Sequence, residues 1–183
     1  MPSRHVHSAG ECPKNVKLED LNKLESFEAE SRFRDCCGSR EWARRMAADR
    51  PFNSPEELTG RAETLWNALA PGDWLEAFAA HPKIGAKKAA PAQAALAAEW
   101  SKGEQAGMDS AEARVRDDLA EANSLYEEKF GYIFIVCATG KTAEEMLALC
   151  RGRLGNPPET ELPIAAQEQR KITEIRLRKL LES

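Results

Sequence analysis

The chain has 183 residues, 42% of them hydrophobic, which is enough for one domain with a sizeable core and without disulfide bonds. Its 26 Lys and Arg residues face 30 Asp and Glu residues, and the net charge of −4 disfavours nucleic acid as a partner, because no basic excess would neutralise phosphates. The sequence shows no apolar run long enough to span a membrane and no signal-peptide pattern, so we expect a soluble, cytoplasmic protein without a membrane partner.

Cysteine and histidine usage disfavours a metal site. The five cysteines are an odd number without CxxC or zinc-like spacing, which indicates reduced thiols, several of them packed as small hydrophobic residues. Only three histidines occur, and His5 and His7 lie in the polar stretch over residues 1–16, which we expect to be a mobile tail. We therefore expect neither a metal nor another cofactor.

The first half of the chain contains several helix start signals. Ser26 is a predicted N-cap, and Ser39 predicts the start of a second helix that stops at residues 50–52. Ser54 with the proline and glutamates after it predicts a third helix, which breaks at Pro71-Gly72.

A short helix capped by Asp73 is predicted next, with Trp74, Leu75 and Phe78 on its inner side. It must end near His81, because Pro82 pushes the residue before it out of helical geometry.

The second half is also predicted to be helical. Helices are expected over residues 91–105, from 110 to a stop at Gly131, from a capping box at residues 142–145 to Gly155, and over residues 160–181. Residues 132–138 form the one continuous β-branched and aromatic run, which predicts a buried extended segment. One strand cannot make a sheet, so residues 17–183 are expected to form a single all-α domain, a bundle of about eight helices with short loops.

The sequence lacks the glycine-rich nucleotide loops, the His-Glu-x-x-His motif and the Gly-x-Ser-x-Gly motif, so any catalysis here should be cofactor-free acid–base chemistry. His81 is a candidate general acid or base, because its imidazole exchanges protons near neutral pH and its turn is rigid. The alternative is a histidine that caps the last carbonyls of its helix.

Two further groups are candidates for the same chemistry. Ser101, Glu104 and Gln105 share one face if the helix around them persists, although a solvated helix end explains them equally. Arg176, flanked by Ile172 and Ile175, could hold an anionic group, or could be an ordinary surface arginine.

The motif His81-Pro82-Lys83-Ile84-Gly85 resembles the signature of the OHCU decarboxylases, which convert 2-oxo-4-hydroxy-4-carboxy-5-ureidoimidazoline (OHCU) to (S)-allantoin in urate degradation. The resemblance extends from about residue 18 to residue 181. Its other elements, in the order of the family, are Trp42 with residues 50–52, residues 101–105, residues 130–136, residues 153–156 and residues 171–177.

This resemblance implies an all-α fold, a homodimer and a cofactor-free carboxy-lyase. It makes His81 the catalytic histidine and Glu104 the carboxylate that assists it. It implies substrate-binding roles for Ser101, Gln105 and Arg176, for Pro82 in the pocket wall, and for the backbone around Phe134 and Ile135. Two other hypotheses remain open: a non-catalytic helical interaction module, and a metal site that combines His81 with cysteines.

Overall fold

The computed structural model describes residues 16–82 and 113–181, and within these ranges the chain forms eight helices and no strand. The helices are α1 (Leu18–Lys23), α2 (Ser26–Cys37), α3 (Arg40–Ala48), α4 (Pro55–Asn67), α5 (Pro71–Ala79), α7 (Ala113–Phe130), α8 (Ala143–Arg153) and α9 (Pro158–Leu181). The all-α prediction is confirmed for the described part of the chain. The helix expected over 91–105, and the expected tail up to residue 15, lie outside the described residues.

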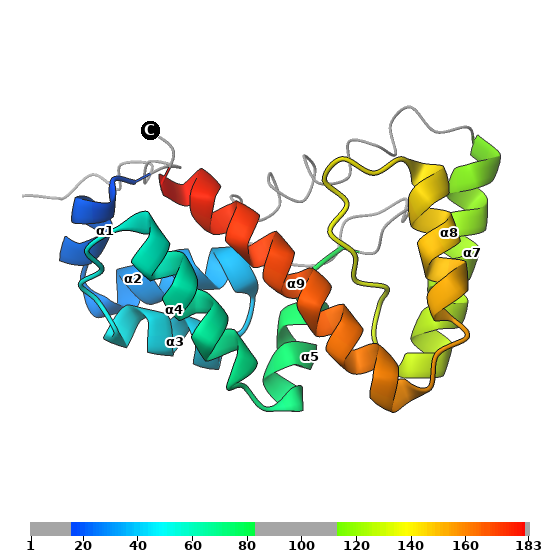
Figure 1. Cartoon of the computed structure of the whole chain (residues 1–183), viewed down its shortest axis with the longest axis horizontal. Coiled ribbons are helices and arrows are strands. Elements are labelled where there is room, and N and C mark those ends of the chain that lie inside the picture. Colours follow the sequence, from blue (N-terminus) through cyan, green and yellow to red (C-terminus); the bar gives the residue numbers. More distant parts are fainter. Residues whose placement is uncertain (1–15, 83–112, 182–183) are drawn as a thin grey trace, which may run out of the picture.

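Helix α9 joins two groups of helices. Helices α1 to α5 gather at one end of the molecule, α7 and α8 pair at the other, and α9 runs diagonally between the two groups (Figure 1). Helices α2, α4 and α5 pack directly against α9. A side chain on α9 is therefore within reach of several elements that are distant in the sequence.

The predicted extended segment over residues 132–138 lies between two hydrophobic cores. Its odd positions pack into the core made by α1 to α5 and α9, and its even positions pack into the core made by α7 and α8. The residues concerned are Ile133, Ile135 and Cys137 on the first side, and Phe134, Val136 and Ala138 on the second. This period of two is that of an extended chain buried on both faces, so the prediction is confirmed.

Local capping signals place the helix starts. Ser39 Oγ accepts from the N–H of Trp42 at 3.3 Å, and Ser54 Oγ accepts from the N–H of Glu57 at 3.1 Å. Thr142 and Glu145 form the expected capping box, each side chain accepting from the other residue's N–H. These bonds satisfy N–H groups that have no partner inside a helix.

Other expectations about the helix ends are corrected. Ser26 is the first residue of α2 rather than its N-cap, which is Glu25. Pro71 begins α5 instead of only breaking the chain, because proline at the first helical position gives up no hydrogen bond. Asp73 lies one turn inside that helix, where its carboxylate accepts from the N–H of Ala70 at 3.2 Å. Leu75 is 39% exposed rather than packed inward.

The Arg50 side chain joins two helix ends. Its guanidinium donates to the carbonyls of Leu21 at 2.7 Å and Leu24 at 2.8 Å, and its Nε donates to the carbonyl of Ala47 at 3.0 Å. Helices end with unpaired carbonyls, and Arg50 satisfies them where α1 and α3 meet. The motif over residues 50–52 therefore has a structural role.

Within the described ranges, every helix is too short or too polar to span a lipid bilayer.

Candidate active site

His81 lies directly after α5 and is buried. Its backbone N–H donates to the carbonyl of Phe78 at 3.1 Å, and only 9% of the residue is exposed. Pro82 follows and disfavours helical geometry at His81, so α5 stops at Ala79 and the imidazole is held inside the molecule.

Arg176 on α9 is the charged group beside His81. Only 2% of Arg176 is exposed, so it is not the ordinary surface arginine that the sequence left open. Burial lowers the pKa of His81 to about 3, and the positive charge of Arg176 adds to this lowering. Both effects disfavour the imidazolium, so His81 is neutral near pH 7 and can accept a proton.

The same arginine also acts on residues of α2. Burial raises the pKa of Asp35, and the charges of Arg32 and Arg176 oppose that rise. The pKa of the Cys36 thiol is raised by burial, again against the charge of Arg176. The thiol therefore stays protonated and is a poor nucleophile. Arg176 thus lies at the junction of α2, α5 and α9.

Gln169 is a buried polar residue that the sequence analysis did not select. It shares a face of α9 with Thr173 and Arg176, at spacings of four and seven residues, which is the signal that could have found it. Its Nε2 donates to Thr173 Oγ1 at 3.2 Å and to the carbonyl of Cys37 at 3.5 Å. Among the described residues, neither its Oε1 nor Nε2 of His81 has a hydrogen-bond partner.

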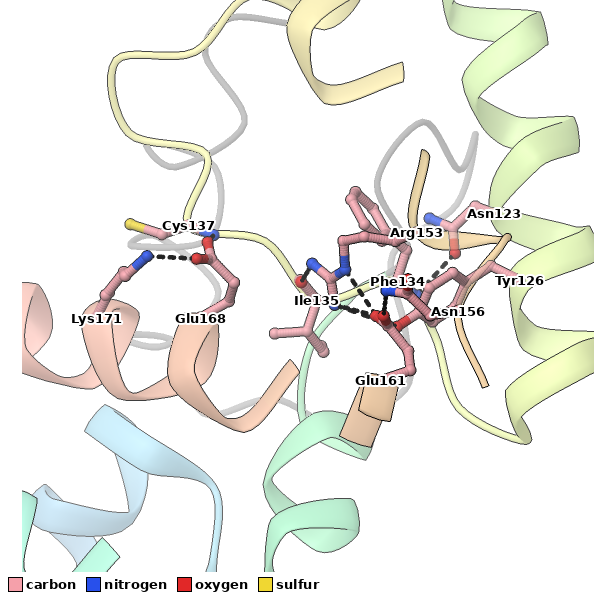
Figure 2. A network of polar contacts seen from close by, with 10 residues as sticks. All are labelled: Asn123, Tyr126, Phe134, Ile135, Cys137, Arg153, Asn156, Glu161, Glu168 and Lys171. Carbon is pink, nitrogen blue, oxygen red and sulfur yellow. Dashed lines mark hydrogen bonds and ion pairs between the residues drawn. The ribbon is translucent and has the colours of Figure 1, made fainter. Parts of the chain in front are cut away.

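Side chains anchor the backbone of the extended segment. Asn123 Oδ1 accepts from the N–H of Phe134 at 3.1 Å, and Glu168 Oε2 accepts from the N–H of Cys137 at 2.8 Å (Figure 2). The carbonyl of Ile135 accepts from Arg153 at 2.8 Å. Because residues 16–82 and 113–181 contain no strand, these bonds replace a sheet ladder. The N–H of Phe134 is thus already paired, whereas no described residue accepts from the N–H of Ile135.

A buried ionic network holds the segment from the side of α8. Glu161 is fully buried, and its Oε1 accepts from Tyr126 and from Nε of Arg153 at 2.6 Å (Figure 2). Its Oε2 accepts from Asn156 Nδ2 at 2.7 Å. The guanidinium of Arg153 also lies 4.8 Å from the ring centroid of Phe134. The sequence analysis noted Arg153 and Asn156 within a motif, but it missed Glu161 and Tyr126.

The extended segment also contacts the helix that carries His81. The rings of Tyr132 and Phe78 lie 5.3 Å apart, centroid to centroid. Of the eight predicted site residues, His81, Pro82, Phe134, Ile135 and Arg176 are described, and Ser101, Glu104 and Gln105 lie outside the described residues. The structure thus brings α9 and the extended segment into contact with α5, and the neutral imidazole of His81 follows the end of α5.

A second candidate location for the active site is a pocket on another part of the molecule. It measures about 180 Å³ and lies between α4 and α9, where it is lined by residues including Glu63, Trp66, Arg170 and Leu177. Arg170 NH1 already bonds Glu63 across it. Neither His81 nor Arg176 lines it, so we place the candidate active site at His81.

Comparisons of the chain with a family model, with curated proteins and with solved structures all indicate the same family. Residues 22–178 match the family model described as OHCU decarboxylase. The uric acid degradation bifunctional protein TTL of Arabidopsis thaliana is 40% identical over 151 residues, which are 82% of this chain and 47% of that protein. The chain thus spans about half the length of this relative.

A second relative and a solved structure agree. The 2-oxo-4-hydroxy-4-carboxy-5-ureidoimidazoline decarboxylase of Amia calva is 30% identical over 135 residues, 73% of this chain and 75% of that protein. A crystal structure of an OHCU decarboxylase in the presence of (S)-allantoin is 40% identical and superposes with a TM-score of 0.73 over 84% of this chain and 99% of that one.

Proposed function

The chain belongs to the OHCU decarboxylase family, and on that premise we propose that it converts OHCU to (S)-allantoin without a cofactor. One observation on the molecule carries the proposal. A single imidazole, buried and neutral, lies beside a buried arginine in a chain that matches the family over residues 22–178. An acid–base decarboxylase that acts on an anion can use this pair of groups, the imidazole for proton transfer and the guanidinium to bind the anion.

The decarboxylation of OHCU requires few functional groups from the protein. Breaking the bond to the carboxylate carbon releases CO₂. The bonding pair forms a double bond to the adjacent ring carbon, and the electron pair of that carbon's C=N bond moves onto the ring nitrogen, which takes up a proton from solvent. The hydroxyl oxygen then becomes the carbonyl oxygen of allantoin as it loses its proton, and the neighbouring carbon gains a proton on one face. The substrate supplies its own electron sink, so the protein must orient the carboxylate and control two proton transfers.

We assign these proton transfers to His81, whose neutral ring presents a lone pair, and an anionic substrate beside Arg176 would offset the charge that disfavours the imidazolium. A neutral imidazole can take the hydroxyl proton and return a proton to carbon from one side, which would set the S configuration. Arg176 would hold an anionic or carbonyl oxygen in a fork of N–H donors, where burial strengthens the attraction.

The remaining assignments follow the resemblance. Glu104 would orient His81 or the substrate hydroxyl, and Ser101 and Gln105 would bind the ureido and carbonyl groups. Pro82 would form part of the pocket wall. On the extended segment we assign the substrate contact to the N–H of Ile135 rather than that of Phe134, which already donates to Asn123.

A circular-dichroism time course with freshly generated OHCU tests the function. We expect the protein to accelerate the appearance of optically active (S)-allantoin well above the spontaneous decay, and to do so equally after treatment with a chelator. Allantoin that forms at the spontaneous rate, and as a racemate, would instead favour the helical interaction module. Loss of activity on chelation would favour the metal site.

We further propose a cytoplasmic homodimer. Cys36, Cys37 and Cys150 are buried free thiols, as expected in a reducing compartment. Burial raises the pKa of Cys37 to about 11, so this thiol resists oxidation. Sedimentation velocity tests the dimer, and cell fractionation tests the compartment.

A further inference from the structure

We propose that Gln169 is a positioning residue for His81: its Oε1 accepts a hydrogen bond from Nε2–H of the imidazole and so leaves Nδ1 as the ring nitrogen that accepts protons. This inference deepens the proposed function and rests on it. It starts from two buried atoms, Nε2 of His81 and Oε1 of Gln169, to which the described residues offer no other hydrogen-bond partner. A buried polar atom without a partner is costly and calls for an explanation.

The hydrogen bonds around Gln169 decide which way its amide points. Thr173 Oγ1 donates its own proton to the backbone carbonyl of Gln169 at 3.0 Å, so it can only accept from the amide. The amide Nε2 donates to this hydroxyl and to the carbonyl of Cys37. Both of its neighbours are thus acceptors, which assigns the NH₂ group to that side and Oε1 to the other.

The packing of α2 on α5 brings this amide to the imidazole. Gly38 follows Cys37 with φ of 91°, and a Cβ placed on it would lie 2.6 Å from the Cβ of Ala80. Ala80 is the neighbour of His81. The carbonyl that accepts from the Gln169 amide therefore belongs to the residue before Gly38, where the end of α2 closely approaches the end of α5. The side chain of Gln169 also partly offsets the lowering of the His81 pKa.

The donor count then fixes the tautomer. Oε1 of Gln169 can only accept, and a neutral imidazole carries one N–H, so the nitrogen that faces Gln169 must be the protonated one. The other nitrogen is left with its lone pair. Among the described residues, the charge that acts on His81 is Arg176 on α9. Asp35 on α2 lies near Arg176, and Glu76 on α5 pairs with Arg40.

Nitrogen-15 NMR of the full chain without substrate tests the tautomer directly. The chain has three histidines, so the His81 ring can be assigned by comparison with His81→Asn. We expect the protonated nitrogen to be Nε2, and no titration of this ring between pH 5 and pH 8. A wild-type ring protonated mainly on Nδ1 would overturn the proposal, whatever the variants do and whether or not the chain turns over OHCU.

Two substitutions at Gln169 test the role, and Gln167→Leu on the exposed side of α9 is the matched control. Gln169→Leu removes the acceptor, and we expect a mixture of tautomers and a fall in kcat of roughly 10-fold with little change in KM. Gln169→Glu places a carboxylate beside the ring, and we expect it to raise the His81 pKa and to shift the acid limb of the pH–rate profile upward. If His81 keeps its tautomer and its pKa in both folded variants, Gln169 does not position it.

Discussion

The His81→Asn variant is expected to lose at least ~100-fold in turnover number while remaining folded, because general acid–base catalysis typically contributes 10²–10⁴-fold. Asparagine approximates the size of the imidazole and retains an amide N–H that can face Gln169, but it cannot exchange a proton near neutral pH. The measurement is the initial rate of (S)-allantoin formation by circular dichroism, together with the enantiomeric composition of the product. We expect the residual allantoin to approach a racemate.

The His7→Asn variant is the matched control, because His7 lies outside residues 22–178, which match the family model. It should keep the wild-type rate. Stereoselective allantoin formation at nearly the wild-type rate by His81→Asn would show that another group transfers the protons.

The Glu161→Gln variant is expected to lower the free energy of unfolding by about 3–5 kcal/mol, because removing one partner of a buried ion pair leaves the other charge uncompensated. Glu161 is fully buried, and it accepts from Tyr126, Arg153 and Asn156. For a chain of this length, the melting temperature should fall on the order of 10 °C. Urea or thermal unfolding of the purified variant measures the loss.

A second glutamate on the same helix provides the control. Glu174 Oε1 pairs with Arg178 at 2.9 Å, and both side chains are exposed. Exposed pairs of this kind contribute little, so Glu174→Gln should change stability by less than about 1 kcal/mol. Equal losses from the two variants would show that the buried network does not stabilise the fold.

Signals that act over three or four residues could be read from the sequence. Ser39, Ser54 and Thr142 cap helices because each side-chain oxygen meets an N–H three residues later, and the structure confirms all three. The buried extended conformation of residues 132–138 was likewise predicted by their run of β-branched and aromatic residues, whereas the alternation between two cores came from the structure. Phe27 shows the limit of such patterns. Phe27, Phe33 and Cys37 recur at near-helical spacing, yet Phe27 is 73% exposed while the other two are buried, because helical spacing alone does not say which face a partner covers.

The polar groups of the site were harder to predict because their partners are distant in the chain. Gln169 bonds a carbonyl 132 residues away, and Glu161 meets Tyr126 across 35 residues. The spacing of Gln169 to Thr173 and Arg176 indicates a shared face of α9, but nothing near Gln169 or Glu161 in the sequence marks that residue as buried. His81 could be selected because its rigid turn is a local feature, whereas the inward position of Arg176 depends on how α9 crosses α2 and α5.

The central claim, that His81 and Arg176 form one site for OHCU, is tested most directly by a crystal structure of this chain with (S)-allantoin bound. We expect one allantoin molecule with an imidazole nitrogen of His81 and the guanidinium of Arg176 within hydrogen-bond distance, the N–H of Ile135 donating to it, and Glu104, Ser101 and Gln105 completing its contacts. Allantoin bound away from His81, for example in the pocket between α4 and α9, would contradict the assignment.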